Sequence, residues 1–359
     1  MRYIFVVQGE GRGHLTQAIS MSQLLRRAGH EVVGVAVGRC KNRVIPQFFI
    51  DKINCDVTLF DSPAMSYGNS GRSGSIWGTL LNNISPVHMI RWRASTDIIA
   101  RLIEQSRADV VINFYELLMG VATIIHNIKI PVITLAHQYI VNHPHYAHRS
   151  NSDMGQNLLR TNNAICRSGA SKTLILSLYN LDTVKGSNLY CVPPLLREDI
   201  FNLTPQDDGY ILGYMLNPNF LDEVVKWKRQ NPDTEIHLFW DKKDAPAIVE
   251  HSKGLWLHRI DDVAFLEYME RCSGYITTAG FESICEAMYL GKPTLMIPAH
   301  LEQRINAIDA VGAGAGIMSE KFNVGELCDY IPRHNARTAE FREWVDSASE
   351  QFLKHLTAF

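Results

Sequence analysis

The chain has 359 residues, of which 46% are hydrophobic and 20% are charged, a composition that excludes a disordered or collagen-like protein. This length exceeds what one hydrophobic core usually serves, so two domains are expected. The net charge of −2 combines unlike halves: residues 1–195 hold 19 Lys and Arg against 11 Asp and Glu, a net of +8, and residues 196–359 hold 16 against 26, a net of −10. The basic half indicates either attraction between the two halves or an anionic partner. Nucleic acid is not expected, since no strongly basic domain or aromatic nucleic-acid motif is present.

The seven cysteines are scattered and never form a CxxC pair, which argues against a disulfide framework and against a zinc site. The chain begins directly with a predicted strand rather than with a signal peptide. No apolar stretch reaches the ~18 residues of a membrane-spanning helix. We therefore expect a cytoplasmic protein.

Short apolar runs alternate with longer segments of helical period. The runs are continuous rather than alternating, which indicates parallel strands covered by helices on both faces. In the first half the predicted strands are 2–7, 31–36, 56–60, 109–113 and 131–135, and the predicted helices are 13–28, 78–106 and 115–127. In the second half the predicted strands are 209–214, 234–239, 254–258, 274–277 and 293–297, and the predicted helices are 219–229, 262–271, 281–290, 303–313 and 336–356.

The two prolines in CVPPLLRED, residues 191–199, indicate a linker between the halves. The predicted fold is α/β, with two Rossmann-like domains whose parallel sheets face each other across a cleft. The domains are residues 1–195 and 196–335, and a C-terminal helix within 336–359 is expected to pack back on the first domain.

The sequence QGEGRGH follows the first predicted strand. Gly9, Gly11 and Gly13 permit a tight turn and a close approach of ligand at the carboxyl end of that strand, where open parallel sheets bind their ligands. His14 lies at the start of the helix, where the dipole disfavours the cationic ring. We expect a neutral imidazole that accepts a proton, the alternative being a histidine that only caps the helix.

Glu116 follows the strand 109–113 and reaches the same edge of the sheet as His14. A carboxylate there would orient the imidazole and stabilise its cation, so Glu116 is the candidate partner. The alternative is an acid in the first turn of the next helix.

A dinucleotide-binding loop is not expected. The spacing GxGxxG would place its third glycine at position 14, which is His14. The second predicted strand is followed by Gly38 and Arg39, where an acidic residue would bind the ribose.

The most specific pattern is the segment 275–307, YITTAGFESICEAMYLGKPTLMIPAHLEQRINA. A strand and a turn ending in Gly280 precede a predicted helix with Ser283 in its first turn. A phosphate at that N-terminus would meet backbone N–H groups and the hydroxyls of Thr278 and Ser283. Glu286, one turn further, suits the two hydroxyls of a ribose. Because the helix dipole and the hydroxyls take up the pyrophosphate charge, neither a metal nor another cofactor is expected.

After the next strand, Glu302 and Gln303 stand together and suit the hydroxyls of a sugar. Residues 278–307 as a whole resemble the nucleotide-sugar-binding motif of GT-B glycosyltransferases. They are similar to the plant UDP-glycosyltransferases and to the family 28 enzymes, which include the N-acetylglucosaminyltransferase of peptidoglycan precursors. The resemblance implies a donor site that includes Thr278, Gly280, Phe281, Ser283, Glu286, Glu302 and Gln303, and Asn306 follows them in register.

The turn GEGRGH likewise resembles the N-terminal glycine loop of this superfamily. The resemblance implies that His14 is the catalytic base, that Gly11 and Gly13 line the acceptor side, and that the reaction inverts the anomeric centre. It also implies that the nucleobase is held by backbone near Arg259 and Ile260, which favours uridine.

The chain departs from the family pattern in three places. Thr278 and Ala279 stand where the plant motif has His-Cys, and Glu282 replaces an Asn. Residues 211–217, ILGYMLN, lack the Gly-Ser-rich phosphate loop that relatives carry.

Three further segments are ambiguous. His137 and Gln138 follow a predicted strand and suit acceptor binding, although they also fit a solvated loop in which a metal site is not expected. The glycine-rich segment 68–75 suits either a loop over an acceptor or a plain connector. Residues 76–95 mix apolar and basic side chains, which suits either a membrane surface or a half-buried helix.

The predicted function is metal-independent transfer of a sugar from a nucleotide diphosphate sugar, UDP-linked, to an acceptor hydroxyl. The basic first domain suggests an anionic glycolipid or another cell-envelope precursor as acceptor, with peripheral contact at the inner face of the cytoplasmic membrane. Two alternatives remain: a nonhydrolysing UDP-sugar 2-epimerase and a non-catalytic nucleotide-sugar-binding subunit.

Overall fold

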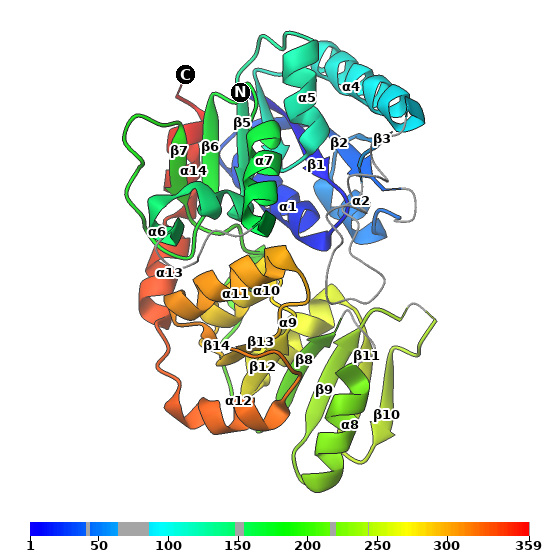
Figure 1. Ribbon diagram of the computed structural model, residues 1–359, viewed down its shortest axis with the longest axis vertical. Coiled ribbons are helices and arrows are strands. Elements are labelled where there is room, and N and C mark those ends of the chain that lie inside the picture. The colour runs from blue at the N-terminus through cyan, green and yellow to red at the C-terminus, as the bar shows by residue number, and fades with distance from the viewer. Residues whose placement is uncertain (41–43, 64–85, 148–153, 216–219, 243, 359) are drawn as a thin grey trace. The chain divides into compact units, whose positions relative to one another are not determined.

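The computed structural model describes residues 1–358 apart from 41–43, 64–85, 148–153, 216–219 and 243. The chain divides into two compact units (Figure 1). The first consists of Met1–Arg197 together with Trp344–Phe359, and the second of Glu198–Glu343. Each unit contains one seven-stranded sheet.

In the first unit the strand order is β3-β2-β1-β4-β5-β6-β7, and all the pairings are parallel. Residues Tyr3–Val7 of β1, an interior strand, are completely buried, as their continuous apolar run predicts. The order reverses between β1 and β4, so the carboxyl ends of these strands flank a switch point. The strands are β1 (Arg2–Gln8), β2 (Glu31–Arg39), β3 (Val57–Asp61), β4 (Val110–Phe114), β5 (Val132–Ala136), β6 (Lys172–Leu176) and β7 (Leu189–Val192).

Helices cover this sheet and bury their apolar sides against it. Ile99 and Ile103 of α4 share a core cluster with Leu118 and Ala122 of α5 and with Ile4 and Val111 of the sheet. The part of the predicted helix 78–106 that precedes α4 lies outside the described residues. The helices are α1 (Arg12–Arg27), α2 (Gln47–Ile53), α4 (Pro86–Ser106), α5 (Leu117–Ile125), η1 (His137–Asn142), α6 (Pro144–Ala147) and α7 (Met154–Cys166).

In the second unit the order is β10-β11-β9-β8-β12-β13-β14, with the switch point between β8 and β12. The edge strand β10 runs antiparallel to β11, whereas the other pairings are parallel. The strands are β8 (Ile211–Met215), β9 (Ile236–Trp240), β10 (Ile248–Ser252), β11 (Leu255–Arg259), β12 (Gly274–Thr277), β13 (Thr294–Met296) and β14 (Gly316–Met318). The helices from residue 198 onward are η2 (Glu198–Asn202), α8 (Phe220–Gln230), α9 (Asp262–Arg271), α10 (Phe281–Tyr289), α11 (Leu301–Ala313), α12 (Val324–Tyr330), η3 (Ile331–Arg333), α13 (Thr338–Asp346) and α14 (Ala348–Leu356).

The sequence did not predict four of the strands, β6, β7, β10 and β14. Each has five residues or fewer, and β14 has three, which is too short to establish a period. The segment 191–199 is also not entirely a linker, because Cys191 and Val192 complete β7.

The predicted C-terminal helix 336–356 is two helices, α13 and α14, separated at Ser347. Long-range hydrogen bonds join the end of the chain to the rest of the first unit. Trp344 Nε1 donates to the Ser177 carbonyl at 2.9 Å, Tyr3 Oη to the Leu356 carbonyl at 3.0 Å, and Lys172 Nζ to the His355 carbonyl at 2.7 Å. These bonds place α14 beside β7 in Figure 1.

Candidate active site

The second unit carries the donor motif at the carboxyl end of β12, on the switch point of its sheet. Strand β12 ends at Thr277, and the turn Thr278–Gly280 leads into α10. Ser283 lies in the first turn of α10 and Glu286 one turn later, as the sequence predicts. Open parallel sheets bind ligands at this place.

The backbone of the turn is held in an uncommon conformation. The residue with a left-handed backbone is Ala279, with φ of 64°, and not Gly280, whose φ is −68°. Asn306 of α11 donates from Nδ2 to the Ala279 carbonyl at 3.0 Å. Gln303 accepts from the Ala299 amide at 2.9 Å, so α11 fixes both the turn before α10 and the loop before itself.

The N-terminus of α10 has no side-chain cap: Gly280 has no side chain, and Ser283 Oγ donates to the Gly280 carbonyl at 3.2 Å. The first amides of a helix have no intrahelical acceptor, and the helix dipole adds partial positive charge there. This end of α10 therefore presents backbone N–H groups suited to an anion.

Glu286 is 2% exposed, so its carboxylate is enclosed within the protein. Burial and the carboxylates of Glu282, Glu286 and Asp309 raise the pKa of the neighbouring Cys285 thiol well above its usual range. A carboxylate accepts hydrogen bonds, so this position suits a ligand that carries hydroxyl groups.

The other predicted donor residues lie in segments that follow the carboxyl ends of strands of the same sheet. Phe281 opens α10 and is buried, Glu302 is half-buried in the first turn of α11, and Ile260 is half-buried just after β11. The loop that follows β8, residues 216–219, lies outside the described residues.

In the first unit, the glycine turn brings β1 close to β2. Gly9 N donates to the Gly38 carbonyl at 2.8 Å, and a Cβ on Gly9 would lie 2.5 Å from that same oxygen. Gly11 caps α1 in an extended conformation, and a Cβ there would meet no atom within 4 Å. Gly13 is the second residue of α1. Gly9 is therefore required by packing, whereas Gly11 leaves open space at the helix N-terminus.

His14 lies in the first turn of α1 and is 7% exposed. Burial lowers the pKa of its ring to about 4, opposed by a hydrogen bond with Gln17. The ring is therefore neutral at pH 7, as expected, with burial rather than the helix dipole as the main cause. Nδ1 lies 3.2 Å from Gln17 Oε1, and a neutral ring that donates there keeps its lone pair on Nε2.

Glu116 is completely buried and caps α5. Its Oε1 accepts from Ser62 Oγ at 2.8 Å and from the Leu118 amide at 3.0 Å, and its carboxyl group packs against Gly38. In the described part of the chain, no hydrogen bond joins Glu116 to His14, so the expected orienting contact is absent. The reason is that the side chain turns back over β2 and β3 to cap its own helix.

Two residues that sequence reasoning missed contact His14. Gln17 is three residues along α1, a spacing that brings side chains together on a helix. Tyr115 follows β4, and its ring centroid lies 5.7 Å from that of His14. The helical spacing could have identified Gln17, but no local pattern marks Tyr115.

His137 and Gln138 open η1 after β5 and are both buried rather than solvated. His137 Nδ1 lies 2.7 Å from the Leu176 carbonyl, and burial lowers the pKa of its ring to about 4. Within the described residues, no three His, Cys, Asp or Glu side chains gather so as to hold a metal ion. The segment 68–75 lies outside the described residues, as does 76–85 of the apolar and basic segment.

Solved structures of low sequence identity share this fold over nearly the whole chain. The glycotransferase of kitacinnamycin superposes with a TM-score of 0.67 at 15% identity, covering 99% of this chain and 98% of that one. The calicheamicin glycosyltransferase CalG4 gives 0.64 at 13% identity with the same coverage. Arabidopsis thaliana UGT89C1, solved with UDP-L-rhamnose, gives 0.62 at 14% identity and also covers 99% and 98%. At these identities the likeness establishes the fold.

Two doubly wound sheets, each with a helix N-terminus at its switch point, define the class of GT-B glycosyltransferases. Residues 1–334 match the model of a protein family described as "Glycosyl transferase family 1". The chain belongs to that family. A Caenorhabditis elegans protein named "Putative UDP-glucuronosyltransferase ugt-48" is 25% identical over 147 residues, which span 41% of this chain and 23% of that protein.

Proposed function

We propose that this protein transfers a sugar from a UDP-sugar to an acceptor hydroxyl. The observation that carries the proposal is the uncapped N-terminus of α10, with the Ser283 hydroxyl in its first turn and the buried Glu286 one turn further. A diphosphate and its pentose carry the groups that complement these two features, an anion for the amides and hydroxyls for the carboxylate.

The donor roles follow the chemistry of each group. The α10 amides with the hydroxyls of Thr278 and Ser283 bind the pyrophosphate, and Glu286 accepts from the ribose hydroxyls. Glu302 and Gln303 bind the sugar, and backbone near Ile260 holds the uracil. The structure solved with UDP-L-rhamnose and the name of the ugt-48 relative support the choice of nucleotide.

His14 is the proposed base. Its Nε2 takes the proton of the acceptor hydroxyl while the oxygen attacks the anomeric carbon, and the bond to the UDP oxygen breaks. A single in-line displacement inverts the anomeric centre. The helix N-terminus of α10 stabilises the charge that develops on the leaving diphosphate, so the step requires no metal.

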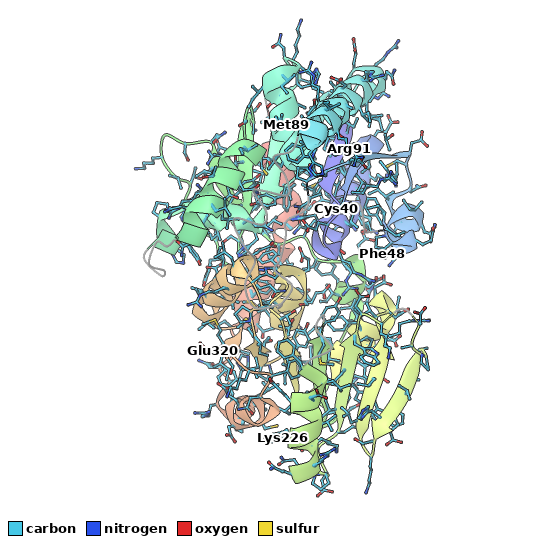
Figure 2. All side chains as sticks on the ribbon, turned by 45° about the vertical axis from the view of Figure 1, so that its right-hand side comes forward. Cys40, Phe48, Met89, Arg91, Lys226 and Glu320 are labelled. Atoms are coloured by element: carbon cyan, nitrogen blue, oxygen red, sulfur yellow. The ribbon has the colours of Figure 1, made fainter. Side chains whose placement is uncertain are left out.

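The proposed acceptor is anionic and lies at a membrane surface, such as a lipid-linked precursor of the cell envelope. The excess of basic residues in 1–195 supports it. So does α4, where the exposed Met89 and Arg91 (Figure 2) are close in sequence to the exposed Ile90 and Arg93. Aromatic and apolar side chains beside basic ones suit an anionic interface. None of the helices in the described part of the chain has the length and apolarity that a membrane crossing requires.

The first test measures thermal stabilisation by a panel of nucleotide sugars. UDP-sugars should stabilise the protein, and Glu286→Ala should weaken their binding by about 10- to 100-fold, because a hydrogen bond to a charged group contributes roughly 1.5–3 kcal/mol. Glu320→Ala, which removes an exposed carboxylate of the same unit (Figure 2), should leave binding unchanged. Binding that survives Glu286→Ala would contradict the assigned donor site.

The second test separates transfer from the two alternatives. His14→Gln should retain UDP-sugar binding and lose transfer, and EDTA should leave transfer intact. Conversion of the donor to its 2-epimer without an acceptor would indicate an epimerase instead, and tight binding with no turnover a non-catalytic subunit. Membrane contact predicts binding to vesicles of anionic lipid that weakens as salt is raised, because salt screens exposed charges.

A further inference from the structure

Tyr115 occupies a costly backbone conformation. Its φ is 58°, between the end of β4 and the cap residue Glu116, although its side chain is large and 2% exposed. For an L residue the left-handed region costs roughly 1–2 kcal/mol, and glycine or asparagine would adopt it more readily. Such strain persists only where the surroundings hold it, and it concentrates at functional sites.

Helix α7 anchors the Tyr115 hydroxyl from two sides. Tyr115 Oη donates to Asn163 Oδ1 at 2.6 Å and accepts from Asn162 Nδ2 at 3.0 Å. Asn163 is itself completely buried and donates to the Gln138 carbonyl at 2.9 Å. Because the hydroxyl is engaged as both donor and acceptor, it holds the ring in place and does not serve as a proton donor to a substrate.

The anchored ring lies between two aromatic neighbours. The Tyr139 ring meets it edge-on, with centroids 5.4 Å apart and planes at 72°. The His14 imidazole lies 5.7 Å away with planes inclined by 32°. The imidazole is thus bounded by the Tyr115 ring and by Gln17, which engages Nδ1.

We propose that Tyr115 is a positioning residue for His14: its ring, fixed to α7 through Asn162 and Asn163, shields the imidazole from water and sets the orientation of Nε2. The proposal rests on the proposed function, in which His14 is the base. The environment of the His14 imidazole can be measured through its pKa, without any turnover.

The shielding explains the direction of the His14 pKa. Burial is the largest cause that lowers it, and the hydrogen bond with Gln17 acts against it. If the Tyr115 ring is removed or loosened, water reaches the imidazole and favours its cationic form. The pKa of His14 then rises toward its ordinary value.

The experiment titrates the folded protein by NMR with labelled histidine, using His14→Gln to assign the His14 signal. In Tyr115→Leu, which keeps a bulky apolar residue in the same backbone conformation, the pKa of His14 should rise by about 1 unit or more. Tyr115→Phe keeps the ring and loses its anchors, so a smaller rise is expected.

Tyr139→Phe is the matched control. It removes another buried tyrosine hydroxyl, which lies 2.6 Å from Thr134 Oγ1, from a ring next to Tyr115 rather than the ring beside His14. The pKa of His14 should keep its wild-type value in that variant.

Kinetics provide the second readout. Tyr115→Leu should lower kcat by roughly 10-fold or more through misplacement of the base, with the KM for the UDP-sugar unchanged. An unchanged His14 pKa in folded Tyr115→Leu would overturn the proposal. A raised pKa together with full activity of His14→Gln would instead leave the positioning intact and refute His14 as the base, so the two failures are distinguishable.

Discussion

Glu116 shows how opposing effects set the protonation of one buried side chain. The pKa of its carboxyl is raised to about 7: burial is the largest cause, hydrogen bonds from the Leu118 amide and the Ser62 hydroxyl act against it, and the nearby Glu10 adds to it. Oε2 is buried and has no hydrogen-bond partner within the described residues. The carboxyl is thus half-protonated near neutral pH.

This shift predicts how the free energy of unfolding depends on pH. Because the folded pKa of about 7 exceeds the ordinary value of 4.5, the folded state binds the proton more tightly. The stabilisation is complete below pH 4.5 and is lost as pH rises through 7. Glu116→Gln cannot titrate, so from pH 5 to 8 its stability should rise relative to wild type by about 3 kcal/mol.

Chemical denaturation of both proteins at several pH values measures that difference. Glu320→Gln, at an exposed carboxylate, should follow the wild-type curve at every pH. A stability of Glu116→Gln that falls relative to wild type as pH rises would contradict the sign of the shift.

His14 and Glu116 also illustrate what local sequence can predict about a side chain. The position of each at a strand's carboxyl end follows from counting along the chain, and Gln17 follows from helical spacing. The hydrogen-bond partner of a side chain does not follow from such counting. Glu116 could cap its own helix or bond to His14, and the packing of β2 and β3 decides between these two partners.

At the scale of elements, α11 supports α10. Asn306 of α11 donates a hydrogen bond to the Ala279 carbonyl in the turn before α10. Because Asn306 is only 3% exposed, this hydrogen bond is buried. The strain of the left-handed Ala279 is offset by such contacts. The turn before α10 and the helix α11 within segment 278–307 therefore stabilise each other.

Asn306→Ala should lower the free energy of unfolding by about 1–3 kcal/mol, because the buried Ala279 carbonyl loses its donor. The same variant should weaken UDP-sugar binding, since the turn that positions the α10 amides is released. Calorimetric titration with UDP measures the binding.

Asn231→Ala is the control for that variant. It removes a similar bond, from Asn231 Nδ2 to the Trp227 carbonyl at 3.0 Å, at the end of α8. It should cost stability and leave UDP binding unchanged. Equal loss of binding in both variants would show that general destabilisation is responsible.

At the scale of the whole molecule, buried and half-buried histidines occur in both units. Burial is the main cause that lowers the pKa to about 4 in His14, His137, His258, His300 and His355. Each is neutral in the folded protein and becomes charged on unfolding below its ordinary pKa of 6.5.

Acidification should therefore unfold the protein. At these five histidines the unfolded state binds more protons between pH 6.5 and 4, so their contribution to stability falls as pH falls through this window. It outweighs the opposite effect of Glu116. The midpoint of thermal unfolding should fall steadily from pH 7 to pH 4.5. A midpoint that is constant over that range would refute the assignment of these rings as neutral.

The sequence by itself determined what depends on local period and spacing. The alternation of buried strands with helices, the start of α10 after Gly280, and the one-turn separation of Ser283 from Glu286 are all set by neighbours within a few residues. A helix geometry of 3.6 residues per turn makes such positions readable without a fold.

Only the tertiary structure decided the features that depend on residues distant in the chain. The strand order, the Asn306 bond to Ala279, the placing of Tyr115 beside His14 and the return of α14 to the first unit each join segments tens to hundreds of residues apart. The physical reason is that burial, which sets the pKa of His14 and Glu116 and offsets the strain at Tyr115, belongs to the packed core and not to any segment.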